Sequence, residues 1–316
     1  MSPRIKQQVK VPRQHAGSRF DQIASDLFPD FSRSRLQLWI KSGELVLDGR
    51  KVKANTKLVG AETLTLDAEL ESQEQWLPED LPLDIVFEDE SILVLNKPVG
   101  MVVHPAVGNW SGTLMNGLLF HRPELSHIPR AGIVHRLDKD TSGLMVVAKT
   151  LGSQLSLVEQ LQAHTVSRTY YAVVKGVPPL AGTVDAPIGR HPTQRVKMAV
   201  VEKNSKKAVT HFERLVEYDG FSLLKLKLET GRTHQIRVHM AHLGYALIGD
   251  SVYGKTPSLA NINNASWLRQ LWSFPRQALH AKALGLVHPG TGEYCEWQTK
   301  LPQDFEGLVT LLEENT

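Results

Sequence analysis

Residues 132–149 read GIVHRLDKDTSGLMVVAK and form a polar loop between two apolar runs. The runs, Ile133-Val134 and residues 144–148, are short and aliphatic, which predicts strand, loop, strand. The loop, HRLDKDTSG, carries a histidine, two hydroxyl side chains and charges of both signs. A charged loop with both ends fixed by strands is a common position for catalytic groups. The stretch therefore predicts a β-rich domain with a functional loop.

Asp138, in the middle of this loop, is the candidate catalytic carboxylate. Loop aspartates often do no more than form turns by bonding their own backbone. Here Arg136 and Lys139 place positive charge beside Asp138, which favours the ionised form that a nucleophile needs. We therefore interpret Asp138 as catalytic.

The composition is that of a globular protein. A chain of 316 residues with 41% hydrophobic residues can form two domains or one large one. No apolar run approaches the length of a membrane span, and no basic segment followed by an apolar one indicates a secretory signal. Cys295 is the single cysteine, which excludes a disulfide within the chain and a cysteine-based metal site. These features predict a cytoplasmic protein without a membrane partner.

Charge is unevenly distributed along the chain. Residues 1–60 hold 12 Lys/Arg against 5 Asp/Glu, a net +7. Residues 61–90 hold no Lys/Arg against 11 Asp/Glu, a net −11, and the remainder holds 24 against 17, again +7. Two basic regions flanking an acidic connector are typical of a protein that binds nucleic acid, although a solvated surface would show similar charges.

The N-terminal part is predicted to contain two helices and a hairpin. A helix over residues 19–28 is followed by a second helix, for which Ser32 supplies the N-cap and Gly43 the C-cap. A hairpin is expected over residues 45–66. Residues 1–16 form either an edge strand or a loose arm.

The rest of the chain changes character after an acidic, proline-containing linker at residues 67–82. Short apolar runs separated by turns then favour strands, including one over residues 168–174. Helices are expected over residues 113–120, residues 154–164 and the stretch from Thr233, as N-cap, to Gly244.

Three motifs together resemble those of the RluA/RluD-type pseudouridine synthases, which isomerise uridine to pseudouridine in RNA. They are HRLDKDTSG at 135–143, RTYYAVVKG at 168–176 and GRTHQIRVH at 231–239. A further block, NKPVGMVVHP at 96–105, is also similar, and SRSR…WIKSGELVLDG at 32–49 resembles the S4 RNA-binding domain. The sequences of these motifs most resemble those of the RluD-type enzymes that modify large-subunit ribosomal RNA.

The resemblance implies an α+β protein in which a small S4-type domain precedes a catalytic domain. The catalytic domain is expected to have the pseudouridine synthase fold, a mixed, mainly antiparallel β-sheet flanked by helices and loops. The implied boundaries are residues 1–16 for an N-terminal arm, 17–66 for the S4 domain, 67–82 for the linker and 83–316 for the catalytic domain.

The resemblance also assigns roles in the pocket. Asp138 is the catalytic carboxylate and Arg237 its buried counter-ion, because a carboxylate withdrawn from water needs a cation to stay charged. Tyr170 packs against the base, and Ile236 closes the apolar wall. The target uridine must be flipped out of the RNA, and Arg136 can occupy the space that it leaves.

Basic side chains in two regions are predicted to bind RNA, chiefly through phosphates. The expected partner is large-subunit ribosomal RNA or its precursor particle, and the protein is expected to be a monomer. The residues are Arg33, Arg35, Lys41, Lys51 and Lys53 in the S4-like part and Arg190, Arg195 and Lys197 in the second.

Neither a cofactor nor a metal is expected. The isomerisation breaks the N1–C1′ bond and joins C5 to C1′, so no atoms enter or leave, and the chain has no glycine-rich phosphate loop of the nucleotide-binding types. His234, His239 and His242 lie close in sequence, but no acid stands at a usual ligand spacing. His104 is interpreted as a structural residue of the cleft rather than a base.

Three alternatives remain open. Glycoside hydrolysis would need a second carboxylate a few ångströms from Asp138, for which Asp140 is the local candidate. The same isomerisation could act on transfer RNA instead of a stem-loop of 23S ribosomal RNA. A non-catalytic RNA-binding factor of ribosome assembly is the alternative from a different class.

Overall fold

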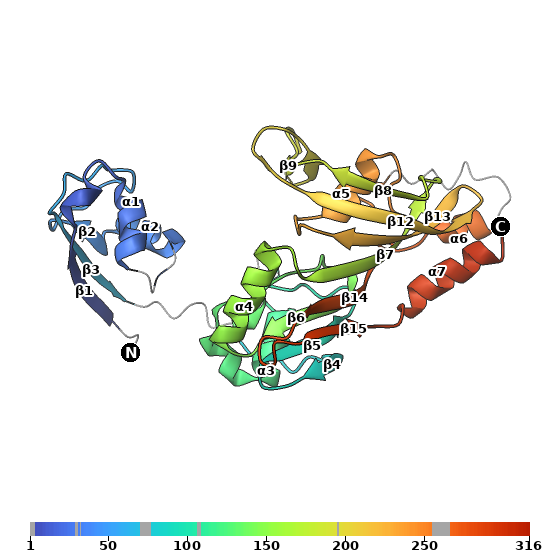
Figure 1. Ribbon diagram of the computed structural model, residues 1–316, viewed down its shortest axis with the longest axis horizontal. Coiled ribbons are helices and arrows are strands. Elements are labelled where there is room, and N and C mark those ends of the chain that lie inside the picture. The colour runs from blue at the N-terminus through green and yellow to red at the C-terminus, as the bar shows by residue number, and fades with distance from the viewer. Residues whose placement is uncertain are drawn as a thin grey trace. The chain divides into compact units, whose positions relative to one another are not determined.

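The computed structural model describes residues 4–28, 31, 33–69, 77–105, 109–194, 196–254 and 266–316, and it divides the chain into two compact units, residues 1–75 and 76–316 (Figure 1). Some sequence predictions fall outside the described residues. They concern Pro29, Ser32, Arg195, the side chain of Arg35 and residues 70–76 of the expected linker.

The N-terminal unit contains a three-stranded antiparallel sheet with the order β1-β3-β2 and two helices. Of the two alternatives for the N-terminal stretch, the structure shows the edge strand, β1. The elements are β1 (Arg4–Lys10), α1 (Phe20–Leu27), α2 (Arg33–Ser42), β2 (Leu45–Leu47) and β3 (Thr63–Glu69). Their core includes Phe20, Leu36, Ile40, Leu45, Leu64 and Leu66, all fully buried.

A buried carboxylate, Asp21, ties the two helices of this unit together. It accepts hydrogen bonds from Arg19 Nε at 3.0 Å, Arg33 Nη2 at 2.9 Å and Gln37 Nε2 at 2.7 Å. Burial alone would raise the pKa of Asp21, but the hydrogen bonds from the two arginines lower it far below its usual range. The side chain of Arg33, which is predicted to bind RNA, is therefore partly exposed and also bonded to Asp21.

The C-terminal unit is built on a nine-stranded sheet with the order β4-β5-β6-β14-β7-β13-β12-β8, to which β15 is added through β14. Among the strands that the structure describes in this sheet, β6 and β14 alone pair in parallel, which confirms the predicted mixed, mainly antiparallel sheet. The strands are β4 (Ile85–Glu88), β5 (Ile92–Lys97), β6 (Ser142–Ala148), β7 (Ser167–Lys175), β8 (Ala181–Asp185), β12 (Val209–Tyr218), β13 (Phe221–Leu228), β14 (Leu279–Val287) and β15 (Tyr294–Gln298). A small sheet, β10-β9-β11, consists of β9 (Ile188–Arg190), β10 (Met198–Val200) and β11 (Ser205–Lys206).

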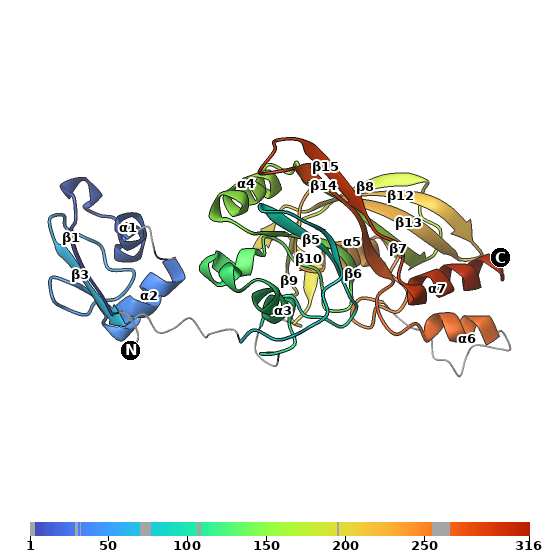
Figure 2. The same cartoon turned by 90° about the horizontal axis from the view of Figure 1, so that it is seen from below.

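Helices cover both faces of the large sheet. Leu157 of α4 packs against Leu144 on one face of β6, whereas Met145 on the other face joins the core that contains Leu118 of α3. Since both faces are covered, every residue of β6 is buried. Helices α6 and α7 lie side by side in both views (Figures 1 and 2). The helices are α3 (Leu114–His121), α4 (Leu151–Gln162), α5 (Gln235–His242), α6 (Ser266–Trp272) and α7 (Gln303–Glu313).

Two local sequence predictions are wrong. Ile133-Val134 is not a strand: Ile133 forms a single bridge with Val147, and the ring of His135 accepts the Val146 N–H at 3.0 Å, where a strand would have placed a backbone carbonyl. Thr233 does not cap α5, because the N-cap is His234, in the left-handed conformation with φ 57° and without a side-chain capping bond.

No helix among the described residues is long and apolar enough to cross a membrane.

Candidate active site

A cleft of about 580 Å³ opens in the C-terminal unit where the loop before β6, the end of α4, β7 and the segment leading into α5 meet. Its volume is within the usual range for small-molecule sites, ~300–1,000 Å³. The structure brings together in this cleft all five side chains expected to form the pocket, from motifs up to 101 positions apart. They are Arg136, Asp138, Tyr170, Ile236 and Arg237.

Asp138 and Arg237 form an ion pair in the cleft. Arg237 Nη1 donates to Asp138 Oδ2 at 3.0 Å, and the side chains of Arg237 and Asp138 are 7% and 17% exposed, respectively. The remaining access of Asp138 is through the cleft. A charged carboxylate is thus held where a ligand can reach it.

A second carboxylate, Asp250, holds the other edge of the same guanidinium. Arg237 donates to Asp250 through Nε at 2.7 Å and Nη2 at 2.9 Å, and Asp250 also accepts the N–H groups of Val252 and Tyr253. Burial alone would raise the pKa of Asp250, but Arg237 and the two N–H groups lower it. Burial would likewise lower the pKa of Arg237, but Asp250 and Asp138 raise it above its usual value. Asp250 therefore fixes the orientation in which Arg237 meets Asp138.

His234 lies on the other side of Asp138. Its Nε2 is 3.7 Å from Asp138 Oδ1, and its Nδ1 is 2.8 Å from the hydroxyl of Tyr253. That hydroxyl accepts the N–H of Met198 at 3.0 Å, so its proton is available to donate to Nδ1. Burial lowers the pKa of His234, although the charge of Asp138 acts in the opposite direction. A neutral imidazole that accepts the Tyr253 proton at Nδ1 carries its own proton on Nε2, the atom near Asp138.

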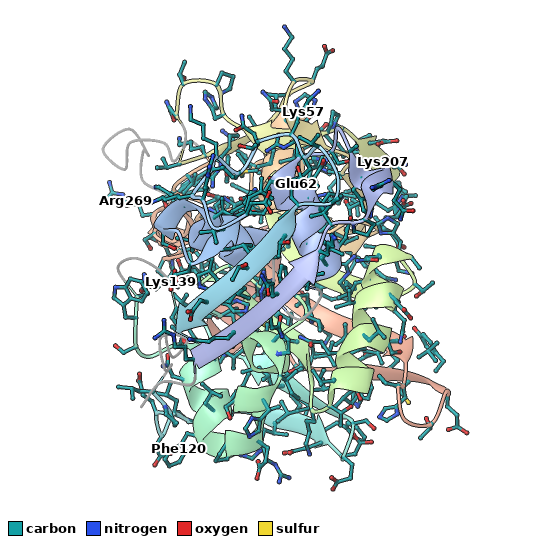
Figure 3. All side chains as sticks on the ribbon, turned by 90° about the vertical axis from the view of Figure 1, so that its left-hand side faces the viewer. Lys57, Glu62, Phe120, Lys139, Lys207 and Arg269 are labelled. Carbon is teal, nitrogen blue, oxygen red and sulfur yellow. The ribbon has the colours of Figure 1, made fainter. Side chains whose placement is uncertain are left out.

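The loop that carries Asp138 is fixed by side chains from distant parts of the chain. The ammonium of Lys97, fully buried, donates to the carbonyl oxygens of Pro98, Met101 and Lys139 at 2.7, 2.9 and 2.9 Å. Burial lowers the pKa of Lys97 to about 8. The side chain of Lys139 is exposed (Figure 3). Its backbone carbonyl oxygen accepts the hydrogen bond from Lys97.

The segment preceding β14 fixes the next residues of the loop. Arg276 Nη1 donates to the carbonyl of Asp140 at 3.2 Å, and Gln277 Nε2 donates to Thr141 Oγ1 at 3.1 Å. Gly143 follows with φ +118°, at a point where an added Cβ would lie 2.5 Å from the backbone nitrogen of Ala281. Only glycine allows β6 and β14 to approach so closely directly after the loop.

The cleft is lined by apolar and aromatic side chains and by basic ones. Tyr170 lies in the centre of the sheet, between Leu226 and Ala281, and burial raises the pKa of its phenol, which stays protonated. Ile236 is buried in the first turn of α5. Arg136 is exposed at the mouth.

His104 also lines the cleft, as expected from its motif. Its Nε2 is buried without a hydrogen-bond partner among the described residues. Burial, together with the charges of Arg130 and Arg136, lowers its pKa to about 4. It is therefore neutral at physiological pH.

Those side chains predicted to bind RNA that the structure describes do not line this cleft. In the N-terminal unit Lys41, Lys51 and Lys53 line a hollow of about 460 Å³ beside α2. In the C-terminal unit Arg190 is exposed at the end of β9, and Lys197 donates to the carbonyl of Val252 at 3.0 Å.

Four important residues were not identified from the sequence: Lys97, Arg168, Asp250 and Arg276. Lys97 and Arg168 stand inside motifs that were noted, but nothing in the motifs indicates burial. Asp250 belongs to the stretch LIGDSVYG, in which an acid between small residues was the available signal.

The histidines of α5 are not gathered with other metal-ligating side chains in the described part of the chain. Among the described residues no group of three or more His, Cys, Asp or Glu side chains is placed to hold a metal. His239 is buried and bonded within the protein, to Thr210 Oγ1 and to the carbonyl of Ala186, each at 2.9 Å.

The second carboxylate required for glycoside hydrolysis is not found among the described residues that line the cleft. Asp138 is the sole carboxylate among the described side chains that line it, and Asp140 is not one of them. The geometry therefore favours a reaction that uses a single carboxylate.

Comparison with known proteins agrees with this geometry. Residues 91–242 match the family model described as RNA pseudouridylate synthase. The Ribosomal large subunit pseudouridine synthase D of Pseudomonas aeruginosa is 52% identical over 315 residues, 100% of this chain and 98% of that protein. The protein of the same name from Escherichia coli K12 is 46% identical over 313 residues, 99% of this chain and 96% of that protein. The human RNA Pseudouridylate Synthase Domain Containing 4 structure aligns with a TM-score of 0.55 and 26% identity, over 72% of this chain and 92% of that one.

The chain therefore belongs to the RNA pseudouridylate synthase family, and it is an enzyme that isomerises uridine in RNA. Within the family, the full-length relatives described above are ribosomal large subunit pseudouridine synthases D. The predicted pseudouridine synthase fold of the catalytic domain and the predicted enzyme class are confirmed.

Proposed function

We propose that the enzyme isomerises uridines of large-subunit ribosomal RNA, in a stem-loop, with Asp138 as the catalytic carboxylate. The observation that carries the proposal is the ion pair of Asp138 with Arg237 in a cleft without another carboxylate among its described lining residues. The substrate class is supported by the names of the relatives, which match the chain over its whole length.

In this mechanism the Asp138 carboxylate attacks either C1′ of the ribose or C6 of the uracil ring. The N1–C1′ bond breaks, the uracil turns in the cleft, and C5 bonds to C1′. The bond that Asp138 made to C1′ or C6 is broken in the course of the reaction, which regenerates the free carboxylate. C5 loses its proton and N1 gains one, so the composition of the RNA is unchanged. Tyr170 supplies a stacking face for the base, and Ile236 excludes water beside it. Arg136, at the mouth, is placed to enter the space that the flipped nucleotide leaves.

We also propose that the N-terminal unit is an S4-type domain, spanning residues 17–66, that docks the enzyme on folded RNA. Support comes from its helix pair and following strands and from the three lysines that line its hollow, Lys41, Lys51 and Lys53. Arg190 adds positive charge to the surface of the C-terminal unit. A monomeric state and a cytoplasmic location stay predictions.

Chemical mapping of pseudouridine in total RNA tests the proposed substrate. Cells with and without this protein are compared after carbodiimide treatment, and loss of signals confined to large-subunit ribosomal RNA is the expected result. Losses confined to transfer RNA would keep the chemistry and reject the substrate. An unchanged map would reject ribosomal RNA as the substrate.

Removal of residues 1–75 should weaken binding to ribosomal RNA and flatten its dependence on salt. The reason is that phosphate contacts release counter-ions, so fewer contacts give a shallower slope of log K against log salt. Titration of a large-subunit transcript at several salt concentrations measures both quantities. A full-length variant with Lys41, Lys51 and Lys53 changed to Gln is the matched control and should show the same direction of change. An unchanged slope in both proteins would reject an RNA-docking role for the unit.

A further inference from the structure

Arg168, on β7, is a buried arginine without a carboxylate partner. Three arginines are buried in the described part of the chain: Arg168, Arg237 and Arg276. Arg237 is paired with Asp138 and Asp250, and Arg276 forms two hydrogen bonds with Asp304. Arg168, at 7% exposure, forms no ion pair with any described residue. It is thus the exception among the buried arginines.

The contacts of Arg168 hold the guanidinium in place without neutralising it. Nη2 donates to the carbonyl of Glu229 at 3.0 Å and more weakly to that of Leu228 at 3.5 Å. Nε is buried without a hydrogen-bond partner among the described residues. Gly231 lies directly against the group, since an added Cβ would be 2.7 Å from Nη1. The turn at Gly231 therefore fits closely around a fixed cation.

Arg168 belongs to the active cleft. It lines the same cavity as Asp138 and lies two positions before Tyr170 on β7, so both side chains are on the same face of the sheet. Its charge also reaches His135, whose low pKa results from burial first and from Arg168 second. The guanidinium of Arg168 is therefore near Tyr170, on which the base is proposed to stack, and within the same cleft.

A buried charge of this kind weakens the free protein. Burial lowers the pKa of Arg168, but a guanidinium does not lose its proton in proteins, so the charge stays. An uncompensated buried ion is unfavourable, and side chains that reduce stability inside an active site are commonly retained for ligand binding. An anion that enters with the substrate would supply the missing partner.

We propose that Arg168 binds the phosphodiester next to the target uridine and so sets the position of the nucleotide over Tyr170. The phosphates are the anionic groups of RNA, whereas uracil is neutral before the reaction begins. A guanidinium matches the non-bridging phosphate oxygens with parallel N–H donors. The proposal rests on RNA as the substrate, which the family establishes, and does not depend on which RNA it is.

The test compares Arg168→Gln with Arg122→Gln, which removes the same charge from an exposed arginine outside the cleft. For Arg168→Gln we expect binding of a large-subunit ribosomal RNA transcript to weaken about tenfold. The slope of log K against log salt should fall by roughly 0.7–0.9, the change for one phosphate contact. Arg122→Gln should change neither quantity. Arg168→Lys should keep the slope, because it keeps the charge.

The thermal midpoint separates this role from a structural one. If Arg168 served only to bond the carbonyls of Leu228 and Glu229, Arg168→Gln would lower the midpoint and leave the salt slope unchanged. If the residue is kept for an anion, the neutral variant should unfold at the same temperature or higher, because a buried charge has been removed.

A modified RNA gives the decisive comparison. A synthetic stem-loop with a methylphosphonate replacing the phosphodiester beside the target uridine should bind wild type more weakly and should bind Arg168→Gln no worse than unmodified RNA does. The proposal would be overturned if the loss of affinity caused by Arg168→Gln and the loss caused by the methylphosphonate simply added together. It would also be overturned if Arg168→Gln lowered kcat at saturating RNA and left the salt slope unchanged. Failure of wild type to convert the ribosomal fragment would instead reject the proposed substrate, and the salt series would then use a transfer RNA transcript.

Discussion

Asp138→Asn is expected to abolish pseudouridine formation, with a loss of at least about 10³-fold in the single-turnover rate. The substituted amide would keep the shape of the side chain and lose the charge that attacks the nucleotide. Arg237 keeps its two hydrogen bonds to Asp250, so the cleft should persist. The rate is measured on a large-subunit ribosomal RNA transcript, with RNA affinity and thermal midpoint measured alongside.

Asp140→Asn is the matched control for this variant. Asp140 lies in the same loop, and its carbonyl rather than its carboxylate contacts Arg276. Since its side chain does not line the cleft, this variant should retain most of the activity. Equal losses in the two variants would contradict the assignment of Asp138, as would substantial turnover by Asp138→Asn.

Arg237→Met is expected to reduce the free energy of unfolding by about 3–5 kcal/mol at neutral pH, the usual cost of removing one partner from a buried ion pair. The variant leaves Asp250, whose side chain is fully buried, with only the N–H groups of Val252 and Tyr253. Activity should also be lost, because Asp138 no longer has its counter-ion. Denaturant unfolding at several pH values measures the first effect.

The loss in free energy of unfolding caused by Arg237→Met should depend on pH in a defined direction. In the native protein the pKa of Asp250 is lower than in the unfolded chain, so its ionisation contributes stability above the unfolded pKa of ~3.9. That contribution is lost as the pH falls through the folded pKa. Without Arg237 the carboxylate loses most of this benefit, so the difference between variant and wild type should be largest near neutrality and shrink in acid.

A second substitution checks the cause. Arg237→Met combined with Asp250→Asn removes the buried charge and keeps an acceptor for the two N–H groups, so part of the stability should return at neutral pH. A deficit that is independent of pH and unaffected by Asp250→Asn would indicate lost packing instead of an unpaired carboxylate.

The sequence was sufficient to predict which residues of the three motifs come together in the site. Asp138, Tyr170, Ile236 and Arg237 were predicted to meet, and they line one cleft. The mixed sheet was also predicted. These features depend on local patterns and on family motifs.

What could not be predicted depends on tertiary placement. Asp250 orients Arg237 across 13 positions, and Lys97 reaches the carbonyl of Lys139 across 42, distances for which no periodicity gives a signal. Ile133-Val134 has a strand-like composition, yet the ring of His135 takes the hydrogen bond that pairing would need. Nothing in the sequence distinguishes Arg168 from an exposed arginine on a strand, whereas in the structure it is buried.

The position of β14 has a consequence for how the chain becomes active during synthesis. This strand is made after both β6 and β7 but lies between them, in the middle of the sheet. Until it is released from the ribosome, the two halves of the sheet cannot join, and Arg276 and Gln277 cannot hold the loop of Asp138. A nascent enzyme is therefore unable to modify RNA before β14 has been made and has left the ribosome.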